Sequence, residues 1–102
     1  MRTYRLEIDA SAREDLGELS GFLAENMSEE VAWQYKEAMR QEILSLAIFA
    51  DLYRVSRYAD VRRIHPQARH MVSHNKRWVY IFHIEKNVVV IDRIKAAKMI
   101  KR

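Results

Sequence analysis

The first quarter of the chain changes from a strand-like to a helical pattern of apolar residues. Residues 4–9 alternate polar and apolar side chains with period two, which is typical of a short β-strand. Ser11 and Glu14 then have the spacing of a capping box, so Ser11 is expected to be the N-cap of a helix that runs to about Asn26. The apolar residues of this helix recur at helical intervals: Ala12, Leu16, Leu19 and Leu23.

A second, longer helix is expected directly behind the first. Ser28 suits an N-cap, and Glu29 and Glu30 suit the positive end of the helix dipole. Because only Asn26-Met27 links the two patterns, the helices are expected to form an antiparallel hairpin. One face of the second helix is apolar at helical spacing: Val31, Tyr35, Met39, Ile43, Leu46 and Ala50.

Both glycines of the chain, Gly17 and Gly21, lie inside the first helix. Glycine inside a helix costs roughly 1 kcal/mol relative to alanine, so a compensating reason is expected. The simplest reason is that another helix approaches closely along this strip of small residues.

The last third of the chain is strand-like. Residues 69–74 predict one strand, and Trp78–Ile84 and Val88–Ile94 predict two more, because they are rich in β-branched and aromatic residues. Lys86-Asn87 suits a two-residue hairpin turn, in which the asparagine tolerates a positive φ. Residues 96–101 predict a final helical turn.

The order of these elements is β-α-α-β-β-β, which indicates one α+β domain over residues 1–102. An N-terminal strand and a helical hairpin precede a C-terminal three-stranded meander, and the hairpin packs on a mostly antiparallel sheet. The turn predicts facing pairs: Ile84–Val89, His83–Val90, Phe82–Ile91, Ile81–Asp92 and Tyr80–Arg93. The face toward the helices is expected to hold Tyr80, Phe82, Ile84, Val89 and Ile91. The other face is expected to hold Val79, Ile81, His83, Val88, Val90, Asp92 and Ile94.

The second sheet face is largely apolar, although two helices can cover only the first. An uncovered apolar face containing a histidine and an aspartate points to a partner protein or a substrate cleft. The alternative is that residues 51–68, which lose periodicity and contain the only proline, fold over this face.

The net charge of +4 is unevenly distributed along the chain. Residues 1–53 contain eleven acidic and five basic residues, whereas residues 54–102 contain three acidic and thirteen basic residues. This imbalance suggests a surface that meets nucleic acid or an acidic protein segment, although a solvated basic loop would have the same composition.

The composition excludes several classes of site. The absence of cysteine excludes a disulfide scaffold, a thiolate zinc site and a cysteine nucleophile. A zinc site from His65, His70 and His74 would need a fourth ligand and a closed geometry, so no metal and no cofactor are expected. The N-terminus does not resemble a signal peptide, and no apolar run is long enough to span a bilayer, so a cytoplasmic protein is expected.

The chain resembles the RelE/ParE superfamily of bacterial toxin–antitoxin toxins over nearly its full length. The most specific part is residues 78–94, with an aromatic strand, a tight turn, a valine-rich strand and the closing pair Arg93-Ile94. The upstream segment 66–69, Pro-Gln-Ala-Arg, matches the start of the second strand in many members. The resemblance implies a toxin that a cognate antitoxin holds inactive by lying in grooves on the hairpin and the sheet. The residues proposed to bind the antitoxin are Val79, Ile81, Val88 and Val90.

The superfamily divides by target. RelE-type members cleave mRNA on the ribosome, which requires a base, an acid and cations for the phosphorane charge, whereas ParE-type members poison DNA gyrase. Aligned without gaps, Phe82 takes the position of the family's tyrosine and Val79 that of its catalytic arginine. A shifted alignment restores Arg77 but needs one extra residue before Val88. The ungapped alignment favours the ParE type.

Three functions therefore follow from the resemblance. The first is a ParE-like toxin that contacts gyrase and is neutralised by its antitoxin. The second is a ribosome-dependent endoribonuclease that uses Arg77 or Arg69 with His83, and the third is an inactive member that only binds its partner. Four cations are proposed to bind phosphate or an acidic partner: Arg62, Arg63, Lys95 and Lys98.

Overall fold

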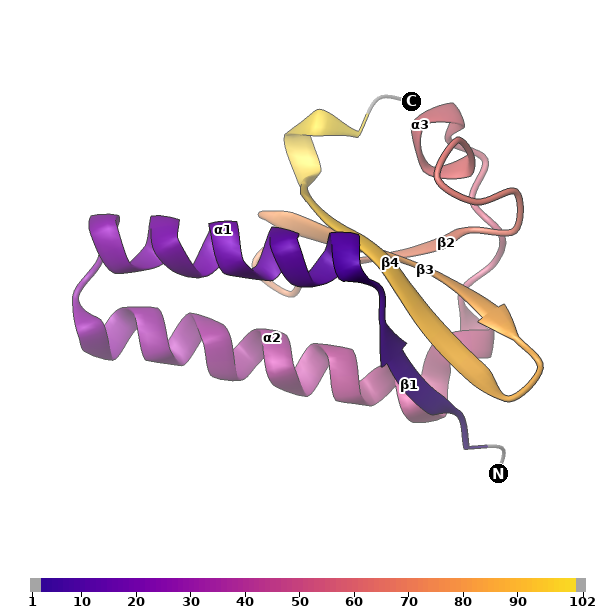
Figure 1. Ribbon diagram of the computed structural model, residues 1–102, viewed down its shortest axis with the longest axis horizontal. Coiled ribbons are helices and arrows are strands. Elements are labelled where there is room, and N and C mark those ends of the chain that lie inside the picture. Colours follow the sequence, from indigo (N-terminus) through magenta and orange to yellow (C-terminus); the bar gives the residue numbers. More distant parts are fainter. Residues whose placement is uncertain (1–2, 101–102) are drawn as a thin grey trace.

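The fold, a computed structural model that describes residues 3–100, has a four-stranded sheet at its centre. Both long helices pack on one face of the sheet, and the connector between the second helix and the second strand packs on the other (Figure 1). The α+β class and the order of the elements are as the sequence predicts. No helix in the described part of the chain is long and apolar enough to cross a membrane.

The N-terminal half is a short strand followed by the helical hairpin. Strand β1 spans Arg5–Ile8, helix α1 spans Ala10–Asn26 and helix α2 spans Glu29–Phe49. Ser28 caps α2 as predicted, because its side chain accepts a hydrogen bond from the backbone N–H of Val31 at 3.2 Å.

The predicted N-cap of α1 is wrong. The cap is Asp9, whose Oδ2 accepts from the backbone N–H of Ser11 at 3.1 Å. Asp9 follows the last residue of β1, and its N–H still donates to the carbonyl of Ile91 in the sheet. The helix therefore begins directly after this hydrogen bond.

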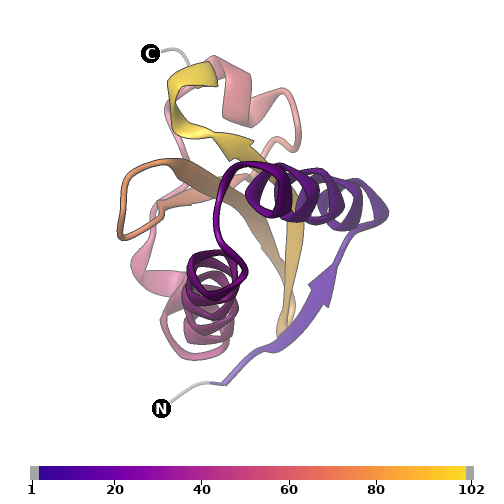
Figure 2. The ribbon, with the colours of Figure 1, turned by 90° about the vertical axis from the view of Figure 1, so that its left-hand side faces the viewer.

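The expected close helix approach at Gly17 and Gly21 is also wrong. Both residues are exposed, and a Cβ atom built on either one would meet no neighbouring atom within 4 Å. Figure 2, which looks along the two helices, shows α1 and α2 side by side as separate rods. The glycines therefore have no packing role in the described part of the chain.

The sheet has the order β1-β4-β3-β2, in which β1 is parallel to β4 and the other neighbours are antiparallel. Strand β2 spans Arg69–Val72, β3 spans Trp78–Glu85 and β4 spans Val88–Ala96. In the turn between β3 and β4, the positive φ falls on Lys86, at 58°, and not on the asparagine.

A bulge in β4 corrects the predicted register. The three pairs nearest the turn are correct, but beyond them Ile81 faces Arg93 and Tyr80 faces Ile94. Asp92 is the extra residue, and it shifts the rest of β4 by one position. Ile94 therefore packs in the core under the helices and not on the opposite face.

The connector covers much of the second sheet face, so the expectation that this face is open is wrong for its central residues. Helix α3 (Ala59–Arg62) brings Val61 onto Val79 and Ile81, and all three are buried. Val88 and Val90, nearer the turn, are half-buried. Two short 3-10 helices complete the fold, η1 at Ala50–Leu52 and η2 at Ala97–Met99. The predicted final turn extends to residue 101, which lies outside the described residues.

Candidate functional site

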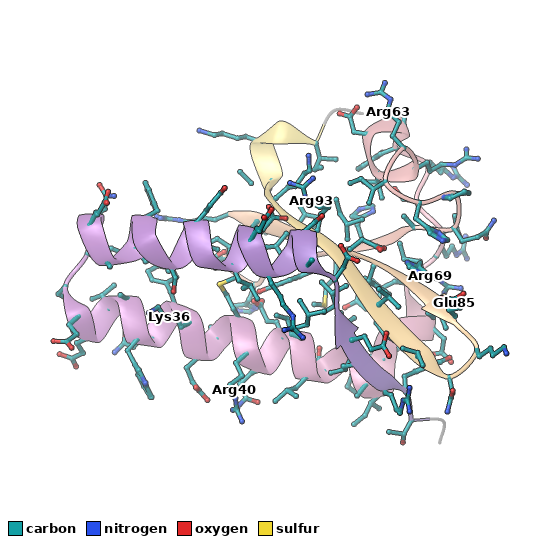
Figure 3. All side chains as sticks on the ribbon, in the orientation of Figure 1. Lys36, Arg40, Arg63, Arg69, Glu85 and Arg93 are labelled. Atoms are coloured by element: carbon teal, nitrogen blue, oxygen red, sulfur yellow. The ribbon has the colours of Figure 1, made fainter. Side chains whose placement is uncertain are left out.

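An apolar groove of about 430 Å³ lies between the helical hairpin and the edge strand β1. Lys36 and Arg40 of α2 add two cations to a lining that is otherwise almost entirely aliphatic (Figure 3). Arg40 also forms an exposed ion pair with Glu37 at 3.3 Å. The aliphatic lining comes from all three elements: Leu6, Ile8, Leu16, Leu19, Leu23, Met39, Ile43 and Leu44.

The apolar surface of the groove continues along α2 toward η1. Leu44, Ile48 and Leu52 follow one another at intervals of four residues, and 44%, 39% and 73% of their surfaces are exposed. Four-residue spacing places Leu44 and Ile48 on one face of α2, whereas Leu52 lies beyond the end of that helix, in η1. This second apolar stripe was not predicted from the sequence, although its spacing is visible there beside the stripe that begins at Val31.

The opposite sheet face holds a closed cluster of histidines. His83 of β3 lies 2.7 Å from Asp92, between Nδ1 and Oδ2, and the ring of His65 stacks on the His83 ring with centroids 3.8 Å apart and planes 3° apart. His83 keeps only 8% of its surface exposed. Burial raises the pKa of Asp92, and the hydrogen bond from His83 offsets part of that rise. An imidazole with one nitrogen engaged and one ring face covered is not open to a substrate.

His70 lies in a second closed arrangement on the same face. Its Nδ1 is 3.1 Å from the hydroxyl of Ser56, and its ring stacks on Tyr58 at 5.1 Å. Burial lowers the pKa of His70, so this ring is neutral near pH 7. The histidines therefore attach the connector to the sheet, and among the described residues no group of three or more His, Cys, Asp or Glu side chains is arranged to hold a metal ion.

The three residues expected to form a nuclease site are not brought together. Arg69 pairs with Phe82 across β2 and β3, so its side chain lies on the helix side of the sheet, and its Nη1 donates to the carbonyl of Tyr53 at 2.6 Å. Arg77 lies just before β3, six residues or about 20 Å of strand from His83. Arg77 is exposed and lies over the ring of Tyr35 at 5.8 Å.

The four proposed phosphate-binding cations also fall into separate places. Arg62 and Arg63 line an open hollow of about 370 Å³ beside α3, where Arg63 pairs with Asp60 at 3.0 Å. Lys95 and Lys98 lie at the end of β4 and in η2, and they line different hollows.

An ion pair missed by the sequence analysis joins α1 to the bulge of β4. Arg93 donates to both carboxylate oxygens of Asp15, at 2.8 and 3.0 Å, and the N–H of Ile94 donates to the same carboxylate at 2.9 Å (Figure 3). Burial raises the pKa of Asp15, but these hydrogen bonds outweigh burial and lower the pKa overall. Arg93, which the sequence marks only as a closing residue of the strand, therefore orients the helix that lines the groove.

The sequence and the fold of the chain are both similar to those of known proteins. A sequence model of the family described as "ParE toxin of type II toxin-antitoxin system, parDE" matches residues 6–100. Among solved structures, "Chromosomal ParDE TA system from P. aeruginosa" is similar, with a TM-score of 0.76 and 17% identity over 92% of this chain and 96% of that chain. No curated protein sequence matches the chain. At 17% identity the solved structure establishes a shared fold.

Proposed function

Because the chain belongs to the ParE toxin family of type II toxin–antitoxin systems, we propose that it inhibits DNA gyrase and that a cognate antitoxin holds it inactive. The proposed place of action is the cytoplasm, where gyrase and its DNA are found. The toxin acts in this proposal by protein–protein contact and uses no cofactor.

The observation that carries this proposal is the state of the sheet face opposite the helices. RNA cleavage needs a proton acceptor, a proton donor and cations around one phosphate. Here His83 is stacked under His65 and bound to Asp92, while Arg69 and Arg77 lie elsewhere. The arrangement supports a toxin that acts by binding its target over one that cleaves RNA, and this is the difference between the ParE and RelE types.

The apolar groove is the proposed site of the antitoxin. Its aliphatic lining and the exposed Ile48 one turn beyond Leu44 fit the apolar face of an amphipathic helix or an extended segment. Lys36 and Arg40 favour acidic residues on that segment. The groove is proposed as the antitoxin site in place of Val79 and Ile81, because the connector covers both of these residues. Val88 and Val90 keep part of their surface exposed to solvent.

Inducible expression in a bacterium tests the target. Incorporation of labelled thymidine and of labelled methionine is followed over the first minutes after induction. The proposal predicts an early fall in thymidine incorporation while methionine incorporation continues. An early fall in methionine incorporation alone would instead indicate a ribosome-dependent nuclease.

A charge placed in the groove tests the antitoxin site. Burial of a leucine side chain is worth about 1.5–3 kcal/mol, so Leu44→Glu is expected to weaken antitoxin binding at least about tenfold. Ala38→Glu is the matched control, because it adds the same charge to an exposed position of α2 outside the groove. Equal antitoxin affinities for the two variants would exclude the groove as the site.

A further inference from the structure

A second hollow, of about 480 Å³, lies on the other flank of α1 and has a different chemical character. In Figures 1 and 2, α1 lies between α2 on one side and η2, drawn in yellow, on the other. The lining includes Lys98 of η2, so this hollow is on the η2 side of α1. Of its lining residues, only Leu19 also lines the apolar groove. The lining consists of Leu19, Phe22, Lys76, Arg77, Ala96 and Lys98.

The hollow combines an apolar floor with three cations, and none of the described residues that line it is acidic. Phe22 is 55% exposed, which is unusual for an aromatic side chain on a helix that also packs on a core. Lys76, Arg77 and Lys98 are exposed around it. Arg77 also lies over the ring of Tyr35 at 5.8 Å, and the three cations together create a positive potential over an apolar surface.

The walls of the hollow are held by backbone hydrogen bonds. The N–H of Lys76 donates to the carbonyl of Ser73 at 2.9 Å and closes the turn before β3. The carbonyl of Arg77 accepts from the N–H of Ala97 at 2.9 Å, which ties this turn to η2. Because the backbone of this turn is already held, binding of a partner would restrict mainly the side chains, and no further backbone ordering would add to the entropic cost of binding.

We propose that this hollow binds an acidic protein segment that carries a large apolar side chain, and, resting on the function proposed above, that the segment belongs to gyrase. The three cations supply the charge complementarity, and Phe22 with Leu19 supplies the contact for the apolar side chain. Duplex nucleic acid fits less well, because its bases are stacked within the helix and phosphate contacts need cations but no aliphatic or aromatic floor. A partner seated in the groove would reach Leu19, so antitoxin and target would meet across α1.

The direct test uses the purified chain and two probes, and it does not involve gyrase. The first probe is a heptapeptide of six acidic residues, aspartate and glutamate, around one central phenylalanine, and the second is a short DNA duplex. Two-dimensional amide NMR is expected to show that the peptide shifts the amides of Phe22, Lys76, Arg77 and Lys98. No peptide-induced shifts at these amides, or shifts there caused by DNA and not by the peptide, would overturn the proposal.

Matched variants establish that the side chains are responsible. Arg77→Glu is expected to weaken peptide binding about tenfold, whereas Arg54→Glu makes the same charge reversal at an exposed arginine outside the hollow and leaves binding unchanged. Phe22→Ala is expected to weaken binding, and Trp33→Ala, at another exposed aromatic residue, is not. Equal affinities within each pair would also overturn the proposal.

The link to gyrase is tested separately with the same variants. If the unmodified chain inhibits gyrase and Arg77→Glu inhibits it equally, the assignment of the hollow to gyrase is wrong while the proposed function stands. If the unmodified chain does not inhibit gyrase, the proposed function is wrong, and the peptide result alone decides whether the hollow binds acidic segments.

Discussion

The phenol of Tyr80 stands at the centre of the polar network that joins β3 to α2. Its hydroxyl donates to Oε1 of Glu42 at 2.6 Å and accepts from Nε1 of Trp78 at 3.0 Å. The other carboxylate oxygen of Glu42 accepts from the N–H of His74 at 2.5 Å, which ties in the turn before β3. Tyr80 is fully buried, and burial raises the pKa of its phenol, with the hydrogen bond to Glu42 adding to the rise, so the hydroxyl keeps its proton.

Tyr80→Phe is therefore expected to destabilise the chain without changing its shape. A hydrogen bond to a charged group contributes about 1.5–3 kcal/mol, and an unsatisfied buried donor, here the Trp78 N–H, costs about 1–3 kcal/mol. Glu42 is half-buried and recovers part of its loss from water, so the total cost is about 2–4 kcal/mol. For a chain of this length, this corresponds to a fall in Tm of roughly 10–25 °C.

Urea unfolding followed by far-UV circular dichroism measures this cost. The control is Tyr53→Phe, which also removes one phenol hydroxyl but keeps the edge-to-face contact of the ring with Phe82 at 5.9 Å. The control is expected to change the free energy of unfolding by less than about 0.5 kcal/mol. A Tyr80→Phe variant as stable as this control would refute the network as a source of stability.

Two further predictions concern α1. Gly17→Ala and Gly21→Ala are each expected to raise the free energy of unfolding by about 0.5–1 kcal/mol, because a Cβ atom at either position meets no neighbour. Thermal unfolding measures the change, and a loss of stability would contradict the open environment of these glycines. The pKa of Asp15 is lower in the folded chain than its value of about 3.9 in the unfolded chain. The stability that Asp15 contributes is therefore complete at pH values above the unfolded pKa and is lost as pH falls through the folded pKa. Asp15→Asn is therefore expected to flatten the dependence of stability on pH below about pH 4, and an unchanged acid limb would show that Arg93 does not hold this carboxylate.

Local patterns predicted the elements of this fold well because the relevant signals lie within a few residues. Ser28 and the acidic residues behind it cap α2 as expected. At α1 two residues that can cap a helix, Asp9 and Ser11, lie two positions apart. Asp9 is the cap because its N–H makes the last backbone hydrogen bond to β4, which is a tertiary contact that the local sequence does not show. The bulge at Asp92 had no such local signal, because both faces of the sheet are buried and the apolar residues Ile91 and Ile94 fit a regular strand equally well.

Long-range packing decides the features that the sequence did not predict. Val61 lies in a segment without periodicity, so nothing local indicates that it covers Val79 and Ile81. The apolar groove takes its lining from β1, α1 and α2, and the sequence shows the apolar residues of each element but not that they line one groove. His83 and Asp92 were placed correctly on one face, but their closure by His65 depends on the path of the connector.

The supercoiling of relaxed plasmid by purified DNA gyrase, measured in the presence of the purified chain, decides whether gyrase is the target. If it is, supercoiling falls as the chain is added and returns when the cognate antitoxin is supplied in equal amount. Undiminished supercoiling at a tenfold excess of chain over gyrase, by a preparation that still binds its antitoxin, would show that gyrase is not the target.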